Sequence, residues 1–456
     1  MRAAFAPFAF LALLAACAVP PAPTAPNAAR APLADLPAMR VFAQTPPQRP
    51  LRPNGEMARN FLDLSFRLET GEDLPVLTRF EGPVSVAMTG AVPPTAGADL
   101  GRLLTRLRSE ADIDIFRTDG PAAITVEFLP RRVMQAQVPQ AACFVEPGVS
   151  SWQEYRTLAR SPETDWARLT RRDRVAVFIP NDTAPQEIRD CLHEEIAQAL
   201  GPLNDLYELP DSVFNDDNFH TVLTGFDMLM LRVHYAPDLA SGMTRAAVAA
   251  RLPAIFARLN PAGERPAGPP VDPTPRVFVR AVEAALGPRG SPSARRSAAA
   301  RAVDIVRSRG WRDERAGFAL YAFGRLIQSR DATAAQAAYL GARAAFDAIP
   351  GAEIQRAQVD LPLATFALSR GDAPAAIQIA RAAMPAARRA QNAALLAELQ
   401  RTEAAALRLL GRGAEADAAR LDSLGWARYG FGSVEEIANF DASFRSLERL
   451  AEVTQQ

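Results

Sequence analysis

The spacing of apolar residues changes along the first half of the chain, and the change predicts a body that combines helices and strands. Alternating or continuous apolar runs predict strands at residues 83–88, 123–129 and 174–179. Apolar residues that recur three or four positions apart predict helices at residues 60–68, 100–107 and 188–200. The mixture of the two kinds of element predicts an α/β domain over residues 54–259.

The second half of the chain changes to a helical pattern. A Pro- and Gly-rich stretch predicts a linker at residues 260–276, and residues 277–456 are rich in Ala, Leu and Arg. Turn-like marks recur about every 40 residues, at 329–331, 369–372 and 410–413. A fixed period of this size predicts an all-α domain of stacked helix pairs that resemble tetratricopeptide repeats, although those repeats are shorter, at ~34 residues. A plain helical bundle is the alternative.

Net charge and missing residue types exclude several classes of function. Lys plus Arg and Asp plus Glu both number 51, so the formal net charge is zero. This balance gives no excess of positive charge for binding a nucleic-acid backbone, and we therefore expect no nucleic-acid partner. All 51 basic residues are Arg, which excludes a P-loop lysine, a Schiff-base lysine and a Ser-Lys dyad. The sequence also lacks the motifs GxSxG, GxGxxG and CxxC.

The N-terminus has the pattern of an export signal. Met1 and Arg2 precede an apolar stretch at residues 3–15, which is shorter than the ~20 residues that a membrane-spanning helix needs. Residues 14–17 read Leu-Ala-Ala-Cys and resemble the bacterial lipobox, in which the cysteine is lipidated. The resemblance implies a signal peptide at residues 1–17 and a covalent lipid on Cys17 as the only membrane contact. An ordinary cleaved signal peptide is the alternative.

The residues after Cys17 indicate where the protein would work. Ala18 is not acidic, so the lipobox resemblance implies the periplasmic face of the outer membrane of a Gram-negative bacterium. Ten of the 36 residues from 18 to 53 are Pro, which predicts a disordered tether over this range. Such a tether would let a folded body work away from the membrane surface.

Two cysteines remain once Cys17 is assigned to the lipid. In an oxidising compartment, Cys143 and Cys191 are expected to form a disulfide. Two separate buried thiols are the alternative.

The helix predicted at residues 188–200 carries the most suggestive chemical pattern in the chain. His193 and Glu194 begin an HExxH zinc motif, but Ala197 stands where the second histidine is required. One residue later, the pattern EExxQxxGxxND has the spacing of the metzincin signature HExxHxxGxxHD. Gly201 occupies the position at which the metzincin helix must break.

This resemblance assigns a role to individual residues. The positions of the three zinc ligands are occupied by Glu194, Gln198 and Asn204. Glu195 occupies the position of the general base, Asp205 follows the third ligand position, and Phe214 stands where the Met-turn has its methionine. Residues 223–235 are similar to the final metzincin helix.

The same residues resemble the domain family DUF2927, which is found in alphaproteobacterial lipoproteins. The resemblance implies that residues 54–259 form a degenerate metzincin-like, or zincin-like, domain. Zn²⁺ prefers nitrogen and sulfur donors and rarely binds neutral amides, so the replaced ligands imply that the metal chemistry is lost. We therefore expect no metal and no cofactor apart from the lipid on Cys17. We also expect Glu194, Gln198 and Asn204 to converge on a polar cleft.

These inferences lead to one main hypothesis and two alternatives. The main hypothesis is an envelope lipoprotein, a pseudoenzyme that binds an unidentified protein or peptide through its helical repeats and acts as a binding or scaffolding module. The first alternative is an active peptidase or hydrolase that uses Glu195 as its base with a non-standard metal site. The second alternative is a structural envelope protein in which the cleft is vestigial.

Two other groups of residues could bind a metal. His193, His220 and His234 are the only histidines, and no two of them have the spacing of a local ligand pair. We expect surface or core histidines here and not a three-histidine zinc site. The residues Asn-Asp-Asp-Asn at 215–218 could ligate Ca²⁺, but a polar loop explains them equally well.

Overall fold

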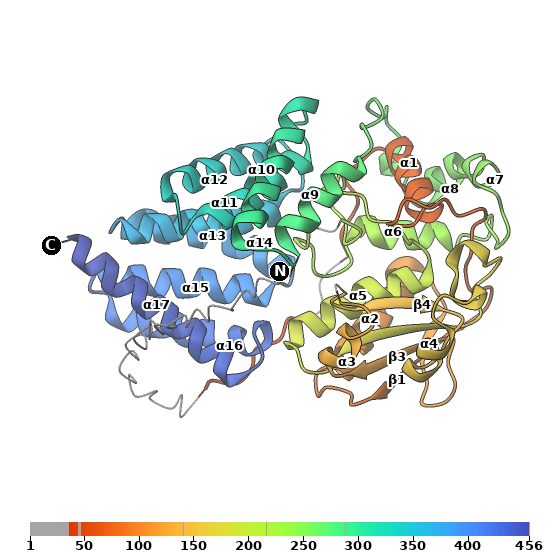
Figure 1. The fold of residues 1–456 in the computed structure, drawn as a ribbon, viewed down its shortest axis with the longest axis horizontal. Helices are drawn as coiled ribbons and strands as arrows, with labels where there is room; N and C mark the ends of the chain where they lie inside the picture. The colour runs from red at the N-terminus through yellow and green to blue at the C-terminus, as the bar shows by residue number, and fades with distance from the viewer. Residues whose placement is uncertain (1–35, 44–46, 140, 216, 288, 456) are drawn as a thin grey trace, which may run out of the picture. The chain divides into compact units, whose positions relative to one another are not determined.

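The structure is a computed structural model that describes residues 36–43, 47–139, 141–215, 217–287 and 289–455, with side chains described as far as residue 445. The predicted signal peptide, the lipidation site Cys17 and residues 18–35 lie outside the described residues. The described residues from Pro37 onward form one compact unit. This unit combines a mixed sheet and its helices with a C-terminal all-helical region (Figure 1).

Five strands form one sheet in the order β2-β1-β3-β5-β4. Their bounds are β1 (Val84–Gly90), β2 (Ile115–Arg117), β3 (Ile124–Leu129), β4 (Phe144–Pro147) and β5 (Val175–Pro180). Neighbouring strands run parallel except β4, which pairs antiparallel with β5 so that Val145 lies opposite Val177. The three predicted strands are confirmed as β1, β3 and β5. The pattern missed β2 and β4 because they have only 3 and 4 residues.

The helices around the sheet precede, connect and follow its strands. They are α1 (Asn54–Ser65), α2 (Ala96–Ala111), α3 (Arg131–Gln135), α4 (Trp152–Leu158), α5 (Pro185–Leu200), α6 (Gly225–His234), α7 (Arg245–Ala249) and α8 (Leu252–Leu259). The helices predicted at 60–68, 100–107 and 188–200 correspond to α1, α2 and α5. The first of them starts earlier than predicted, directly after Pro53, and ends at Ser65.

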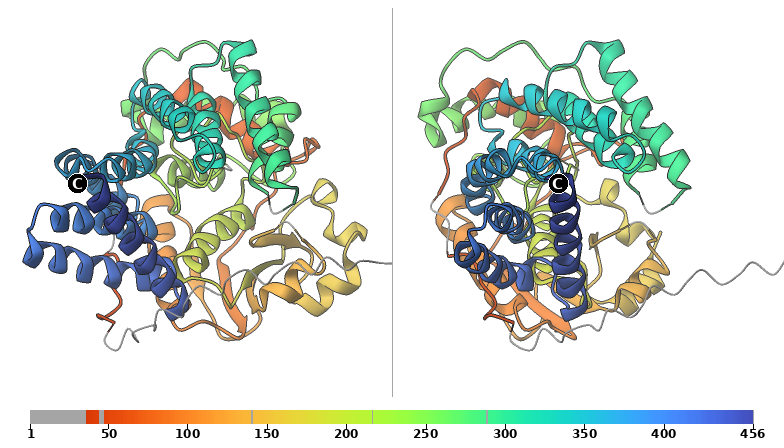
Figure 2. Two further views of the ribbon diagram at one scale, coloured as in Figure 1. Left: turned by 60° about the vertical axis from the view of Figure 1, so that its left-hand side comes forward. Right: turned by 90° about the vertical axis from the view of Figure 1, so that its left-hand side faces the viewer.

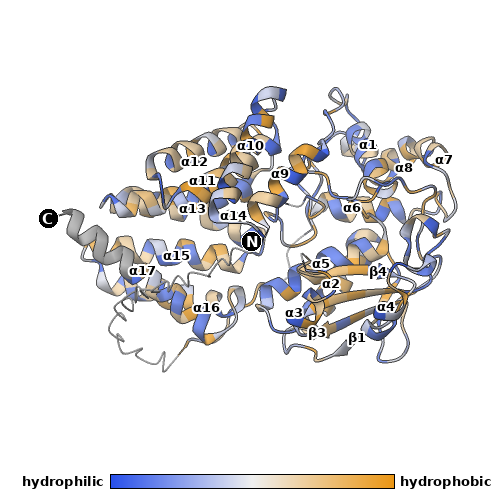
Figure 3. Cartoon of the chain, in the orientation of Figure 1, coloured by the Kyte–Doolittle hydropathy of each residue, from blue (hydrophilic) through white to orange (hydrophobic). Residues whose placement is uncertain are grey.

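The two faces of the sheet pack against different helices. Along β5, Val175, Val177 and Ile179 belong to the main core, which contains residues of α2 and α5. Ala176 and Phe178 face a smaller cluster that contains residues of α3 and α4. Successive strand residues point to opposite faces, so β5 is buried on both sides and its sequence is a continuous apolar run. The strands of the sheet are coloured mainly orange, the hydrophobic end of the scale, in Figure 3.

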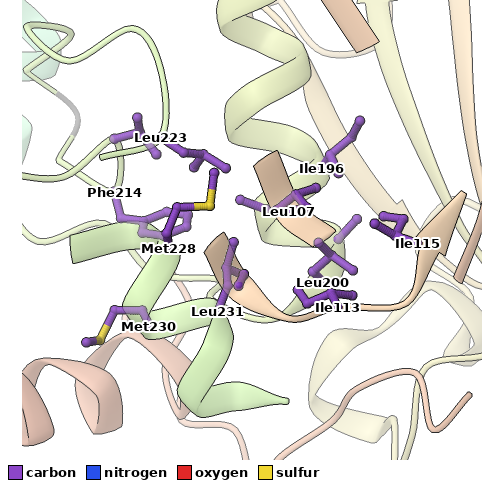
Figure 4. Close-up of a cluster of buried hydrophobic side chains, with 14 of the residues drawn as sticks. Leu107, Ile113, Ile115, Ile196, Leu200, Phe214, Leu223, Met228, Met230 and Leu231 are labelled. Carbon is purple, nitrogen blue, oxygen red and sulfur yellow. The ribbon is translucent and has the colours of Figure 1, made fainter. Parts of the chain in front are cut away.

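The main core extends from the sheet to α6. Helix α6 packs against α2. Met228 of α6 lies beside Phe214, and Leu231 lies on the side of Leu107 of α2 (Figure 4). These contacts hold α6 against α2 and against the segment that precedes α6.

The all-helical region consists of consecutive helices that pack against their neighbours in the chain. Their bounds are α9 (Arg276–Leu286), α10 (Pro292–Arg309), α11 (Glu314–Ile327), α12 (Ala332–Asp347), α13 (Glu353–Ser369), α14 (Ala373–Arg389), α15 (Ala393–Leu409), α16 (Gly413–Gly430) and α17 (Val434–Gln455). The helices follow one another along a curve (Figure 2, teal to dark blue). None of the helices described is long and apolar enough to span a membrane.

The predicted 40-residue period is confirmed as a helix-pair repeat. The turn marks fall where α12, α14 and α16 begin, so each period contains two helices. Asp331 and Asp372 cap the first two of these helices, because their carboxylates accept hydrogen bonds from backbone N–H groups three residues later. Gly371 and Gly411 adopt φ angles of +77° and +72°, a left-handed conformation that suits glycine at the end of a helix.

Part of the segment before α1 makes specific contacts with the folded unit. Phe42 stacks on Trp426 of α16 with ring centroids 4.4 Å apart, and Arg40 N donates to Gly425 O at 2.9 Å. Further along, the Arg52 guanidinium forms an ion pair with Asp211 at 2.7 Å. Residues 37–43 and 47–53 fall inside the range that we predicted as a disordered tether.

Candidate functional site

Helix α5 has two stripes of side chains on opposite faces, because residues four apart lie on the same side of a helix. The apolar stripe belongs to the main core and consists of Ile188, Leu192, Ile196 and Leu200. The polar stripe consists of Gln186, Asp190, Glu194 and Gln198. The first and second predicted ligand positions, Glu194 and Gln198, are therefore one turn apart on the polar stripe.

A cavity of about 240 Å³, which we call the α5 hollow, lies beside the polar stripe. Side chains of α5, α13 and α15 and of the segment before α6 form its walls. Its main polar lining consists of Gln186, Asp190, Glu194, Gln358, Asn392 and Glu398. The sequence pattern identified only Glu194 of these, since the residues from α13 and α15 are distant in sequence.

The three predicted ligand positions do not share this hollow. Glu194 lines it, whereas Gln198 and Asn204 are not among its lining residues. Both amide side chains are buried. The Asn204 amide donates a hydrogen bond to the Asp63 carbonyl oxygen at 3.0 Å, so it is held by the end of α1.

The break after α5 is built as the sequence predicted. Gly201 follows the last residue of the helix, and a Cβ atom at this position would lie 3.0 Å from the ring of His234. Tyr235, the residue after α6, donates its hydroxyl hydrogen to Leu200 O at 3.1 Å. A side chain at position 201 would therefore force the ring of His234, at the end of α6, to shift.

A buried arginine satisfies the carbonyl groups at the end of α5, and sequence reasoning did not identify it. Arg172 Nη1 donates to Ala199 O at 2.6 Å, and its Nη2 donates to Gly201 O at 2.6 Å. A cation at a helix C-terminus is favourable because the last carbonyl groups lack partners within the helix. Burial lowers the pKa of Arg172 to about 10, so the side chain remains charged at neutral pH.

Glu195, the predicted general base, is buried with only 4% of its surface exposed. Burial raises the pKa of its carboxyl well above the usual range, and the neighbouring charges of Glu194 and Glu69 raise it further. Within the described residues, its Oε2 atom receives no hydrogen bond. Burial therefore disfavours the ionised form of this carboxyl, and Glu195 is not among the residues that line the α5 hollow.

Asp227, in the first turn of α6, holds the segment between α5 and α6 by hydrogen bonds. Its carboxylate accepts hydrogen bonds from the Ser212 hydroxyl at 2.5 Å, from Val213 N at 3.2 Å and from Thr224 N at 2.8 Å. Phe214, which stands in the predicted methionine position, is fully buried in the main core. The half-buried Asp205 lies in the same segment, but it is not among the residues that line the α5 hollow.

Residues 207–221 of this segment dock on the helical region. Phe219 packs against Phe318, Tyr321 and Phe346, with ring centroids 5.4 to 5.9 Å apart. Gln355 Nε2 of α13 donates to Pro210 O at 2.6 Å. Side chains of three repeat helices, α11, α12 and α13, are therefore occupied by the protein's own chain.

The three histidines are held by separate backbone groups, and the expectation of core or surface roles fits this arrangement. His193 Nδ1 accepts from Leu223 N at 3.1 Å, His220 Nε2 lies 3.1 Å from Pro210 O, and His234 Nε2 lies 3.0 Å from Thr78 O. Burial lowers the pKa of His234 to about 3. Among the residues described, no group of three or more His, Cys, Asp or Glu side chains could hold a metal ion.

The polar residues at 215–218 make the local bonds of a turn. Asn215 Nδ2 donates to Leu209 O at 2.6 Å, and Asp217 Oδ1 accepts from Phe219 N at 2.9 Å. These bonds support the polar-loop interpretation, although Asp216 lies outside the described residues.

The predicted disulfide is confirmed. Cys143 and Cys191 are bonded, with their Cα atoms 6.0 Å apart. Cys143 immediately precedes β4, and Cys191 lies in the middle of α5. The bond therefore ties the helix that carries the polar stripe to the antiparallel edge of the sheet.

Comparison with known families agrees with the predicted resemblance. Residues 54–254 match DUF2927, a family described as a protein of unknown function. The match begins at the first residue of α1 and ends within α8. No curated protein and no solved structure matches the chain.

Proposed function

We propose that this protein is a non-catalytic, metzincin-like binding module of the cell envelope. In this proposal the lipid on Cys17 anchors the chain to the membrane, and the TPR-like repeats together with α5 bind a protein or peptide. The binding site is the α5 hollow, whose walls come from both the sheet domain and the repeats.

The main observation in support of the proposal is the identity of the residues that occupy the three predicted ligand positions. In place of histidines there are a carboxylate and two amides, and the Asn204 amide is already bonded to the Asp63 carbonyl oxygen. Amides are poor ligands for Zn²⁺, so this set gives no reason to expect tight zinc binding. The glycine break at Gly201 and the tyrosine after α6 support the idea that the scaffold was kept while the chemistry was lost.

The contacts of the repeats support a composite binding site. Free solenoids usually bind partners on a concave surface. Here Phe219 already covers side chains of α11 and α12, so part of the surface of the repeats is used within the chain. The polar groups of α13 and α15 that remain accessible at the α5 hollow are the part best placed to contact a ligand.

The rival proposal is an active hydrolase that uses Glu195 with a non-standard metal. The burial of Glu195 disfavours this role, because a general base must reach the substrate.

Metal content and peptide cleavage separate the two proposals. We expect the purified full chain to contain no stoichiometric zinc after dialysis against a zinc buffer, and to show no metal-dependent cleavage of a peptide library. The double variant Glu194→Ala with Gln198→Ala and the control variant Asp119→Ala, whose side chain is 98% exposed, should then be indistinguishable from the parent in metal content. Stoichiometric zinc and peptide cleavage that both disappear in the double variant alone would overturn the proposal.

A further inference from the structure

The α5 hollow differs from its surroundings in charge. Three carboxylates line it, those of Asp190, Glu194 and Glu398, and no arginine is among its lining residues. This is unusual in a chain with 51 arginines and a net charge of zero. The lining of the hollow is therefore rich in acidic groups, of which Asp190 is paired with Arg189 outside the lining.

Two of the lining groups make no polar contact within the described part of the chain. Gln358 of α13 and Glu398 of α15 have neither a side-chain hydrogen bond nor an ion pair there. Burial raises the pKa of Glu398 to about 7, and the charge of Arg325 opposes this rise. Arg325 is exposed and lies over the Tyr321 ring, 5.7 Å from its centroid.

The other polar side chains form fixed walls. Gln186 Oε1 accepts from Ala393 N at 2.6 Å, and Asn392 Oδ1 accepts from Leu395 N at 3.0 Å. Asp190 is paired with Arg189 at 2.6 Å, and burial raises its pKa to about 6. The hollow thus has fixed polar walls, and the Glu398 carboxylate and the Gln358 amide, which make no hydrogen bond within the described part of the chain, line the cavity between them.

Size indicates what such a cavity could hold. A volume of about 240 Å³ far exceeds the ~30 Å³ share of one water molecule. The three carboxylates are not close enough together to form a metal-binding group. A ligand that spans the cavity and carries a delocalised or hydrogen-bonding positive charge fits this arrangement better than a bare ion.

We propose that the α5 hollow binds the positively charged side chain of an arginine or lysine residue in a peptide ligand, with Glu194 and Glu398 as the charge partners and Gln358 as a hydrogen-bond acceptor. This inference rests on the proposed function, because it names the ligand chemistry of the same site. The ion pairs replace water around the Glu398 carboxylate, which makes no hydrogen bond within the described residues, and this provides the driving force.

The affinity should depend on pH. The titratable and charged groups that face Glu398 are Asp190, Glu194 and His220 across the hollow, and Tyr321 and Arg325 on α11. Protonation of Glu398 and Asp190 removes negative charge, so binding should weaken as pH falls from 8 to 6.

Calorimetric titration of the full chain tests the proposal with two probes, N-acetyl-arginine amide and its uncharged isostere N-acetyl-citrulline amide. We expect saturable binding of the arginine probe and at least roughly tenfold weaker binding of the citrulline probe. Glu398→Gln should weaken arginine binding by a similar factor, whereas Asp304→Asn on the exposed surface of α10 should leave it unchanged. Gln358→Glu, which adds a carboxylate, should strengthen arginine binding. A misfolded variant could not bind more tightly, so this gain would show that the effects on binding do not come from misfolding.

Three results would overturn this inference. They are equal binding of the two probes, arginine binding that survives Glu398→Gln with no gain in Gln358→Glu, and stoichiometric Ca²⁺ binding that is lost in Glu398→Gln. None of them bears on catalysis, so the proposed non-catalytic function would still stand. Zinc-dependent peptide cleavage would overturn the proposed function instead, even if the arginine probe binds.

Discussion

Gln186 and Asn392 lie 206 residues apart, and their side chains form one hydrogen-bonded unit at the junction of α5 and α15. Gln186 Nε2 donates to Asn392 Oδ1 at 3.2 Å, while Gln186 Oε1 accepts from Ala393 N at 2.6 Å and from Ala394 N at 3.0 Å. The first turn of α5 therefore caps the start of a repeat helix. Because backbone N–H groups at a helix start have no partner within the helix, this contact couples the sheet domain to the repeats.

Replacing Gln186 with alanine should destabilise the protein. Two backbone donors at the start of α15 would lose their acceptor, and a buried donor left without a partner costs about 1–3 kcal/mol. Urea unfolding of Gln186→Ala measures the loss in the free energy of unfolding. Gln153→Ala, at an exposed position of α4, is the matched control, and equal stability of the two variants would contradict the capping role.

The docking of residues 207–221 should depend on pH through Glu314. Glu314 is 1% exposed; burial raises its pKa well above the usual range, and the neighbouring carboxyl of Asp217 raises it further. A group whose pKa is raised on folding contributes stability below its unfolded pKa, here 4.5, and loses it as pH rises through the folded pKa. Stability should therefore decrease above pH 4.5, by up to ~1.4 kcal/mol per unit from this group.

Glu314→Gln should remove that part of the pH dependence. Urea midpoints of the parent and the variant, measured from pH 5 to pH 9, should differ in favour of the variant as pH increases. Glu353→Gln changes an exposed carboxylate of α13 and should keep the parent profile. Parallel profiles for Glu314→Gln and the parent would show that the buried carboxyl does not titrate as described.

Phe219 should be the main anchor of the docked segment. Replacing it with alanine removes its ring contacts with Phe318, Tyr321 and Phe346 and should cost about 3–5 kcal/mol. Hydrogen exchange should then become faster in residues 207–221 and in the facing parts of α11 and α12. Phe116→Ala, at a half-exposed position, should change neither, and unchanged exchange in Phe219→Ala would rule out the anchoring role.

The disulfide should contribute strongly to the stability of the sheet domain. Cys143 and Cys191 are 48 residues apart, and closing a loop of this length is worth about 4 kcal/mol in the chain-entropy model. Reduction with dithiothreitol should lower the urea midpoint of the parent. The double variant Cys143→Ser with Cys191→Ser should start at the lower value and not respond to the reductant. A parent midpoint that is unchanged by complete reduction would contradict this expectation.

Elements with a strong local signal could be predicted from the sequence. The helix-pair period follows from the turns that precede α12, α14 and α16, where Asp331 and Asp372 provide capping carboxylates. The apolar run of β5 and the apolar stripe of α5 could also be predicted, because each pattern lies within one short stretch of the sequence. The strands β2 and β4 were missed because 3 or 4 residues are too few to establish a period.

The candidate site was only partly predictable, because most of its residues come from distant parts of the chain. The spacing of Glu194 and Gly201 pointed to α5 and to the break after it, and the structure confirms the helix and its end before Gly201. Arg172 gave no signal, because one arginine in an arginine-rich loop is indistinguishable from an exposed one. Gln358 and Glu398 reach the hollow only through the curvature of the repeats, which the sequence pattern does not specify.

Site-specific crosslinking tests the central claim, that the α5 hollow is a binding site, most directly. A photoreactive amino acid is placed at Gln358, within the hollow, or at the exposed Asp119, and the full chain is irradiated in intact cell envelopes. We expect a discrete crosslinked partner from position 358 and none from position 119. The same adducts from both positions, or no adduct from 358 despite confirmed incorporation and folding, would contradict it.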